Sequence, residues 1–316
     1  MKVIRHLNDF PDLPNGCVAT IGNFDGVHLG HQALLAELAV LAATHAAPRC
    51  VVLFEPQPQE FFTPEHPLAR LTTLREKCEL LASQGVDYVL CLRFGEALAA
   101  LTATHFIERV LISTLKIKSL IVGRDFRFGY CRRGDVDLLH VASRQHGFDF
   151  EPVSDIPSAQ GERISSTAIR HALAQADLES ATGMLGRPYM FSGRVVHGDK
   201  RGRLLGWPTA NIALKRSVSP VYGVYAVRCY GLTPEPIPGV SNIGWRPTVD
   251  GKRHQIEVHL FNFNQDIYGK YVRIEVVQKI RNEQRFDGVE ALKAQIQLDA
   301  EQARKILAVN TTGISS

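Results

Sequence analysis

Residues 1–185 alternate short apolar runs with amphipathic segments of helical length, and this alternation limits the possible folds more than any other feature. The strand-like runs lie at 17–21, 50–54, 86–92 and 118–122. Segments such as "HQALLAELAVLAATHAA" and "TLREKCELLASQG" separate them. This order predicts a Rossmann-like α/β domain, with a parallel sheet covered by helices on both faces. Ligands of such sheets bind at the carboxyl ends of the strands.

Residues 186–316 follow a different pattern. Strand-like runs with alternating apolar residues lie at 192–198, 222–230, 256–262 and 271–280, with turn residues between them. An amphipathic helix is expected from about residue 287 to residue 307. The pattern predicts a small antiparallel β-barrel with a C-terminal helix. We therefore expect two domains, 1–185 and 186–316, in a chain that is long for one compact unit.

The two halves also differ in charge. Residues 1–185 carry 17 Lys and Arg against 21 Asp and Glu, whereas residues 186–316 carry 19 against 11. The second half therefore has a net charge of +8, which indicates a negatively charged partner. Nucleic acid and small phosphorylated ligands both fit this charge.

Bulk composition indicates an ordinary globular protein of the cytoplasm. Hydrophobic residues make up 45% of the chain and charged residues 22%. No apolar stretch is long enough to span a bilayer, and the first residues lack the apolar core of a signal peptide. The six cysteines are scattered without a C-x-x-C pair, so we expect buried free thiols rather than disulfides or zinc ligands.

The stretch "IGNFDGVHLGH" (21–31) occupies the first predicted strand-to-helix turn. Its glycines allow the backbone to approach a phosphate, and the following helix offers free N–H groups and a positive dipole end. His28 and His31 fall on one face of that helical turn. The spacing is neither the dinucleotide fingerprint nor Walker A. The alternatives are a plain glycine turn with incidental histidines, or a zinc site that would need a third ligand.

The stretch "RISSTAIR" (163–170) places three hydroxyl residues before a helical run. One hydroxyl is enough for an N-cap, so capping alone is one interpretation. Together with Arg163 and Arg170, the hydroxyls would also suit phosphate oxygens.

Two features of the second half carry possible chemistry. The loop "HGDKRGRLLGWPTAN" (197–211) is basic and rich in glycine, which suits the phosphates of ATP but also an exposed hairpin. Thr209 and Asn211 could reach a metal and phosphate oxygens together.

Glu257 faces away from Ile256 and Val258 by strand alternation. It is either a solvated strand residue or a carboxylate that accepts a substrate proton.

These motifs resemble known families. "GNFDGVHLGH" followed by "ISSTAIR" is similar to the H-x-G-H nucleotidyltransferases, in their flavin-adenylating branch, with "FEPQP" and "VGRDFRFGYCRRGD" in the expected order between them. The resemblance implies transfer of AMP from ATP to FMN, giving FAD and pyrophosphate. His28 and His31 would act on the α-phosphate, Ser166, Thr167 and Arg170 on the pyrophosphate, and Asp125 and Phe126 on the flavin. The ATP-binding set implied for this domain comprises Gly22, Asn23, Phe24, Asp25, Gly26, His28, His31, Ser166, Thr167 and Arg170.

The second half resembles riboflavin kinase through "GRLLGWPTAN", "GVYAV", "SNIGWRPTV", "EVHLFNFNQDIYGKYV" and "IRNEQRF". The resemblance implies phosphoryl transfer from ATP to the ribityl 5′-hydroxyl, with Glu257 as the base. Thr209 and Asn211 would hold Mg²⁺ and phosphates. The implied ATP-binding residues are Gly198, Lys200, Arg203, Thr209 and Asn211, and the implied flavin-binding residues are Arg281 and Glu283.

The order of the two matches is that of bacterial bifunctional FAD synthetases. We expect riboflavin, ATP, FMN and FAD as substrates and products, Mg²⁺ as the metal, and neither nucleic acid nor membrane as a partner. The sequence gives no oligomeric state. Gln57 and Asn262 stand where relatives often have histidine and aspartate, and neither is given a catalytic role. Two alternatives are a second half that only binds flavin, and a flavin- or RNA-binding regulator.

Overall fold

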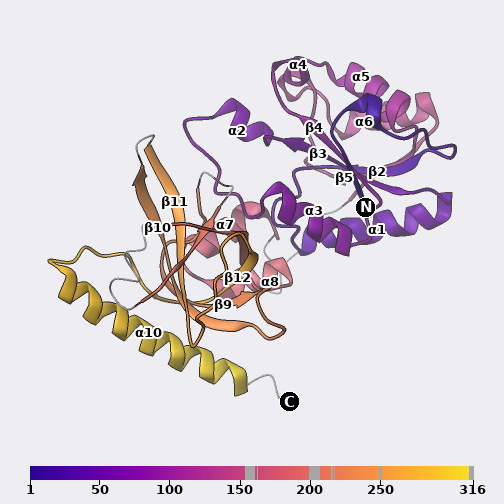
Figure 1. Ribbon diagram of the computed structural model, residues 1–316. Helices are drawn as coiled ribbons and strands as arrows, with labels where there is room; N and C mark the ends of the chain where they lie inside the picture. Colours follow the sequence, from indigo (N-terminus) through magenta and orange to yellow (C-terminus); the bar gives the residue numbers. More distant parts are fainter. Residues whose placement is uncertain are drawn as a thin grey trace. The chain divides into compact units, whose positions relative to one another are not determined.

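The computed structural model describes residues 1–153, 161, 163–198, 207–214, 216, 218–248 and 251–312. These residues form two compact units, and each is described by itself (Figure 1). Unit 1 comprises Met1–Leu68 and Thr72–Ser166, and unit 2 comprises Ala69–Leu71 and Thr167–Ser316.

Unit 1 is built on a six-stranded sheet in the order β1-β4-β3-β2-β5-β6, in which all neighbouring strands are parallel. The strands are β1 (Lys2–Ile4), β2 (Cys17–Ile21), β3 (Arg49–Glu55), β4 (Tyr88–Arg93), β5 (Ile117–Gly123) and β6 (Asp149–Val153). The four strands predicted from the sequence are β2 to β5, so the predicted parallel α/β sheet is confirmed.

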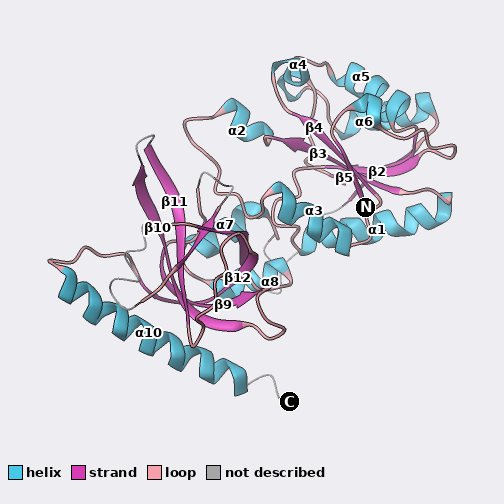
Figure 2. Ribbon diagram, viewed as in Figure 1, coloured by secondary structure: helices cyan, strands magenta, loops and turns pink. Residues whose placement is uncertain are grey.

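Helices cover both faces of this sheet (Figure 2). Helices α1 (Leu29–His45) and α3 (Leu74–Ser83) contribute Leu35 and Leu81 to one apolar cluster, which includes Val18 of β2. The next residue of β2, Ala19, belongs to the cluster on the opposite face. That cluster takes residues from α5 (Ala103–Phe106), the π-helix η2 (Ile107–Thr114) and α6 (Val136–His146). Shorter elements are η1 (Leu7–Asp9), α2 (Pro58–Phe62), α4 (Glu96–Ala99) and η3 (Tyr130–Arg132).

Unit 2 is a closed barrel in the order β10-β11-β8-β7-β12-β9, with antiparallel pairing throughout. Its strands are β7 (Met190–Val196), β8 (Ala210–Ala213), β9 (Gly223–Tyr230), β10 (Ile237–Thr248), β11 (Gly251–Leu260) and β12 (Tyr271–Arg281). The helix α10 (Val289–Thr312) packs on the outside through Ala300, Ala303 and Leu307, against Val224 and Val240. The predicted barrel with a C-terminal helix is confirmed.

Two further helices, α7 (Ser166–Ala174) and α8 (Leu178–Leu185), precede the barrel. Ile169, Leu173 and Leu185 are buried in the same cluster as Phe191 of β7. Because these helices bury their apolar faces with the barrel, the compact units divide at Ser166/Thr167. The domain boundary expected at 185/186 stays a prediction. The assignment of the two activities to 1–185 and 186–316 stays a prediction.

Among the described helices, none combines the length and the apolar character that crossing a bilayer requires.

Candidate functional site

Residues 22–28, called the glycine turn from here on, connect β2 to α1 at the carboxyl edge of the parallel sheet. The turn is tight, with positive φ angles at Phe24, Gly26 and Val27. His28 is the N-cap of α1, and its Nδ1 accepts a hydrogen bond from the backbone N–H of His31 at 3.3 Å. The two imidazoles stack with ring centroids 3.6 Å apart. The structure therefore brings the two predicted catalytic histidines together at a helix N-terminus, where N–H groups favour anions.

The packing around this pair is close. A Cβ at Gly30 would lie 3.1 Å from His28 Nδ1, and a Cβ at Gly22 would lie 3.2 Å from the ring of Phe24. The Phe24 ring in turn contacts the His31 ring, with centroids 4.7 Å apart. The glycines of the motif thus allow the close packing that orients both imidazoles.

Asp25 holds the glycine turn in place. The buried carboxylate Oδ1 accepts hydrogen bonds from the backbone N–H of Thr72 at 3.0 Å and from its hydroxyl at 3.1 Å. The Thr72 hydroxyl also accepts from the N–H of Gly26 at 2.9 Å. Ser166 donates from Oγ to the carbonyl of Asp25 at 2.8 Å, so this predicted phosphate residue lies at the turn. Thr72 was missed by the sequence reasoning.

The electrostatics of the pair favour a neutral His31. Burial, the neighbouring His28 and the ammonium of Lys77 together hold the pKa of His31 well below its ordinary value. In the described part of the chain, the buried Nδ1 of His31 has no hydrogen-bond partner. A neutral imidazole with an unused polar atom can interact with a phosphate oxygen through a hydrogen bond.

The predicted flavin residues lie on the loop after β5. Asp125 forms an exposed ion pair with Arg163 at 2.6 Å. The Phe126 ring stacks on Phe128, with centroids 5.4 Å apart. Phe128 contacts Phe106 at 5.6 Å. A row of aromatic rings, of which only Phe126 was predicted as a site residue, therefore extends from this loop.

Two predicted residues of the adenylyltransferase site belong to unit 2. Thr167 is exposed, and Arg170 donates from Nε to the carbonyl of Ala69 at 2.9 Å. Their contact with pyrophosphate stays a prediction. Gln57, to which we gave no catalytic role, is buried at the N-cap of α2, and its Nε2 has no partner within the described ranges.

The second site lies on the outer face of the barrel. Glu257 of β11 is directly opposite Asn211 of β8 on one side and Asn242 of β10 on the other. Ile212 and Ile256, the next residues along β8 and β11, point into the barrel interior. The three polar side chains therefore form one row on the outside, with Cβ atoms of neighbours about 5 Å apart. The prediction that Glu257 faces away from Ile256 and Val258 is confirmed.

Neighbouring residues fix this row. A Cβ at Gly198 would overlap the side-chain amide of Asn211, which is buried, so glycine leaves room for that amide. His259, two residues after Glu257, makes a hydrogen bond of 2.8 Å from Nδ1 to the carbonyl of Pro208. This contact anchors the segment that carries Thr209. Burial, more than the nearby Arg304, lowers the pKa of His259. Lys200 and Arg203 lie outside the described residues.

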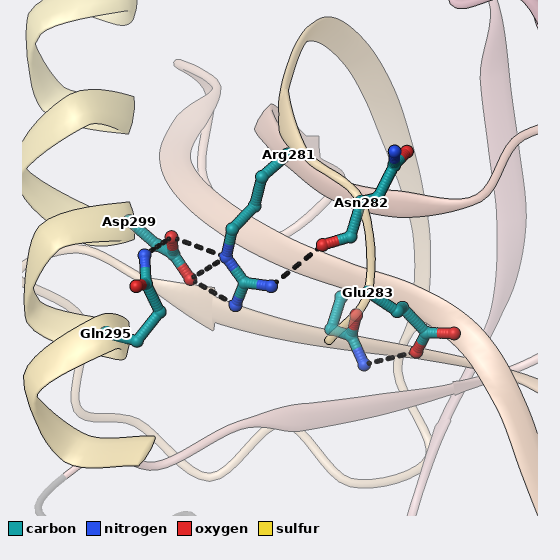
Figure 3. Close-up of polar contacts among 6 residues, drawn as sticks. Arg281, Asn282, Glu283, Gln295 and Asp299 are labelled. Carbon is teal, nitrogen blue, oxygen red and sulfur yellow. Dashed lines mark hydrogen bonds and ion pairs between the residues drawn. The ribbon is translucent and has the colours of Figure 1, made fainter. Parts of the chain in front are cut away.

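Arg281 and Glu283, the predicted flavin residues of the barrel, have protein partners in this structure (Figure 3). Arg281 donates from Nε and Nη2 to the carboxylate of Asp299 on α10, at 2.9 and 2.7 Å, and from Nη1 to the carbonyl of Asn282. Glu283 accepts a hydrogen bond from Nδ2 of Asn242 at 3.2 Å. Arg281 therefore links β12 to α10, and Glu283 reaches the row that contains Glu257. Flavin contact by either residue stays a prediction.

Thr209, together with two members of the row, offers oxygen ligands that fit a hard divalent cation. Thr209, Asn211 and Glu257 offer hydroxyl, amide and carboxylate oxygens, the ligand types that such cations prefer. The amide of Asn211 is held in the space that Gly198 leaves open. The predicted metal pair, Thr209 and Asn211, therefore suits the chemistry of a divalent ion.

Comparisons with known proteins assign a family to each half of the chain. A family model described as FAD synthetase matches residues 11–168, and one described as riboflavin kinase matches residues 185–307. The bifunctional riboflavin kinase/FMN adenylyltransferase of Escherichia coli strain K12 is 52% identical over 306 residues, which cover 96% of this chain and 97% of that protein. The protein of the same description from Pseudomonas fluorescens is 48% identical, with 98% of each chain covered.

The fold is also found in a solved structure. A crystal structure from Streptococcus pneumoniae, described as a macrolide-efflux protein, has a TM-score of 0.80 and 32% identity, with 96% of this chain and 98% of that chain covered. The identity to curated relatives extends over nearly the whole chain, and both halves match their own family model in the same order. The chain therefore belongs to the family of bifunctional riboflavin kinase/FMN adenylyltransferases.

Proposed function

We propose that this chain makes FAD from riboflavin at two separate sites, the glycine turn of unit 1 and the polar row of the barrel. Membership of the family gives the pair of reactions: riboflavin is phosphorylated by ATP to FMN, and FMN is adenylated by ATP to FAD with release of pyrophosphate. The observation that carries the two-site proposal is that His28 and His31 stack in one unit, while Asn211 and Glu257 pair in the other.

In the adenylyltransferase reaction, a phosphate oxygen of FMN attacks the α-phosphorus of ATP, and pyrophosphate leaves. Negative charge develops at the α-phosphate, and hydrogen-bond donors fixed in advance stabilise it best. The imidazoles of His28 and His31, with the N–H groups at the start of α1, are held in place for this role. Both rings stabilise the negative charge on the α-phosphate through hydrogen bonds, and neither acts as a nucleophile. The Phe126 and Phe128 rings offer an apolar surface for the flavin.

In the kinase reaction, the ribityl 5′-hydroxyl of riboflavin attacks the γ-phosphorus of ATP, and ADP leaves. We assign Glu257 as the base that accepts the hydroxyl proton. Asn211, directly opposite, would hold a phosphate or the metal beside that carboxylate. Thr209 lies one residue before β8 and adds a hydroxyl oxygen. Glu283, linked to Asn242, would border the flavin.

We further propose Mg²⁺ as the divalent metal, held by Thr209 and Asn211. Mg²⁺ prefers oxygen ligands and usually binds with substrate phosphates rather than in an all-protein cage. When bound, it would neutralise phosphate charge during transfer. A cytoplasmic location, and the absence of nucleic-acid and membrane partners, stay predictions.

A product time course tests the proposal. The purified full-length chain receives riboflavin, ATP and a magnesium salt, and riboflavin, FMN and FAD are separated at intervals. We expect FMN to appear first and FAD to follow. His28→Ala should lower FAD formation by about 10²- to 10³-fold while FMN accumulates, since one charge-stabilising donor is lost. Glu257→Gln should lower FMN formation by about 10²- to 10⁴-fold while supplied FMN is still adenylated.

Two exposed residues provide matched controls. His146→Ala and Glu235→Gln change the same residue types at exposed positions, so both activities should remain. If either site variant abolished both activities in a folded protein, the two-site proposal would be wrong. Absence of FMN with the wild-type chain would instead indicate a barrel that binds flavin without phosphorylating it.

A further inference from the structure

Lys77 of α3 is buried beside the glycine turn. Only 1% of the residue is exposed, which is rare for lysine because removing an ammonium from water is costly. The Nζ donates a hydrogen bond to the backbone carbonyl of Asn23, in the middle of the turn. The buried ammonium of Lys77, whose desolvation is unfavourable, therefore lies beside the glycine turn, to which we assign the adenylyl transfer.

The start of α3 holds the turn at two points. Thr72, just before the helix, bonds to Asp25 and Gly26, and Lys77 bonds to Asn23. The helix itself begins with a capping box between Thr73 and Glu76, which fixes its first turn. Because the first turn of α3 is held in place, the backbone of Lys77 is fixed and its side chain extends to the glycine turn.

The charge of Lys77 also acts on His31. The titratable groups that influence this imidazole are His28, at the N-cap of α1, and Lys77 on α3; the adjoining ring of Phe24 is apolar. Burial lowers the pKa of His31 most, and both groups lower it further. A hydrogen bond alone could come from an uncharged donor, whereas this effect on His31 requires the positive charge.

We infer that Lys77 is a positioning residue for adenylyl transfer, and that it works through both its hydrogen bond to Asn23 and its positive charge beside His31. The inference rests on the proposed adenylyltransferase role of the glycine turn. The ammonium fixes the turn from behind and adds positive potential where charge develops on the α-phosphate. Electrostatic groups fixed in advance are the most effective in catalysis.

Two substitutions separate the hydrogen bond from the charge. Lys77→Met removes both, and Lys77→Gln keeps an uncharged donor. We expect each to lower kcat for FAD formation from FMN by about 10- to 100-fold, because displacement of a catalytic group by about 1 Å costs up to about 10²-fold. The KM for FMN should change little, and riboflavin phosphorylation by the same molecules should stay within about twofold. Lys116→Met, at a half-exposed lysine of unit 1, is the matched control.

Several outcomes would overturn the inference. FAD formation within about twofold of wild type in Lys77→Met would do so, and wild-type activity in Lys77→Gln would show that the charge is not needed. Equal loss of both activities would reduce Lys77 to a purely structural role. A further measurement uses the protein without substrate. By NMR, the pKa of the His31 ring should be higher in Lys77→Met than in wild type. That readout remains valid if the wild-type chain makes no FAD, which would contradict the proposed function instead.

Discussion

Asn211 and Glu257 lie directly opposite each other on the neighbouring strands β8 and β11, on the outer face of the barrel. They come from segments of the chain that are more than forty residues apart. Antiparallel pairing sets their alignment, because a slip of one residue would turn either side chain into the interior. The barrel therefore specifies an amide and a carboxylate side by side, which is the arrangement that the kinase proposal uses.

Gly198→Ala should disrupt this arrangement. The added methyl group would overlap the Asn211 side-chain amide and push it away from Glu257. We expect FMN formation to fall by about 10²-fold, as for other displacements of about 1 Å, and adenylation of supplied FMN to remain. Initial rates for the two reactions measure this. Gly183→Ala, where a methyl group meets open space, is the control, and equal effects of the two substitutions would contradict the explanation.

The fold could be predicted where burial alone sets the pattern. Strands β2 to β5 are almost continuously apolar, so their runs are visible in the sequence. In contrast, β1 has only three residues and two of them are exposed, while β6 contains Pro152 and no buried residue. The apolar run "ATHFIERVLISTL" (103–115) has the length of a single α-helix, but its residues form α5 followed by a π-helix, in which the Ser113 hydroxyl donates to the carbonyl of Glu108. The spacing of apolar residues does not reveal a change from α-helical to π-helical hydrogen bonding.

The candidate sites could be predicted where a motif is continuous in sequence. His28 and His31 lie three residues apart on one helical turn, and Glu257 alternates with apolar neighbours. Thr72 and Lys77 bond to the glycine turn across a long separation in the chain, and nothing local reveals the contact. The closeness of Asn242 to Glu257 likewise depends on strand register. Such partners become visible only when the chain has folded.

Gly244→Ala tests whether Glu283 is correctly placed. A Cβ at this position would overlap the Glu283 carboxylate, which Asn242 holds at 3.2 Å. If Glu283 borders the flavin, we expect the KM for riboflavin to rise by about tenfold, which corresponds to about 1.4 kcal/mol of binding free energy. A double-mutant cycle compares Gly244→Ala, Glu283→Ala and the variant with both substitutions. Added to Glu283→Ala, the Gly244→Ala change should have little further effect, and a full additive loss would contradict this explanation.

His31 should remain neutral at a pH where a histidine of ordinary pKa is protonated. Its pKa is lowered by burial, by His28 and by Lys77, so its titration should fall below about pH 6.5, the ordinary histidine value. NMR of ¹⁵N-labelled imidazoles measures this, with His31→Gln to assign the signal. The unfolded chain protonates His31 more readily than the folded chain does. The contribution of neutral His31 to the free energy of unfolding is therefore fully present above about pH 6.5, and it is lost as pH falls through the folded pKa. Titration of His31 at or above about pH 6.5 would contradict the prediction.

Asp299→Ala should destabilise the barrel. The Asp299 carboxylate side chain is 5% exposed and forms a paired contact with Arg281, which is 20% exposed. Removing one partner leaves a mostly buried charge, for which losses of about 3–5 kcal/mol are typical; the partial exposure of Arg281 favours about 3 kcal/mol. Both tryptophans, Trp207 and Trp245, belong to unit 2, so their fluorescence during urea unfolding reports on this unit. Glu301→Ala, an exposed carboxylate on the same helix, should change the free energy of unfolding by less than about 0.5 kcal/mol. If Asp299→Ala had an equally small effect, the ion pair would not anchor α10 to the barrel.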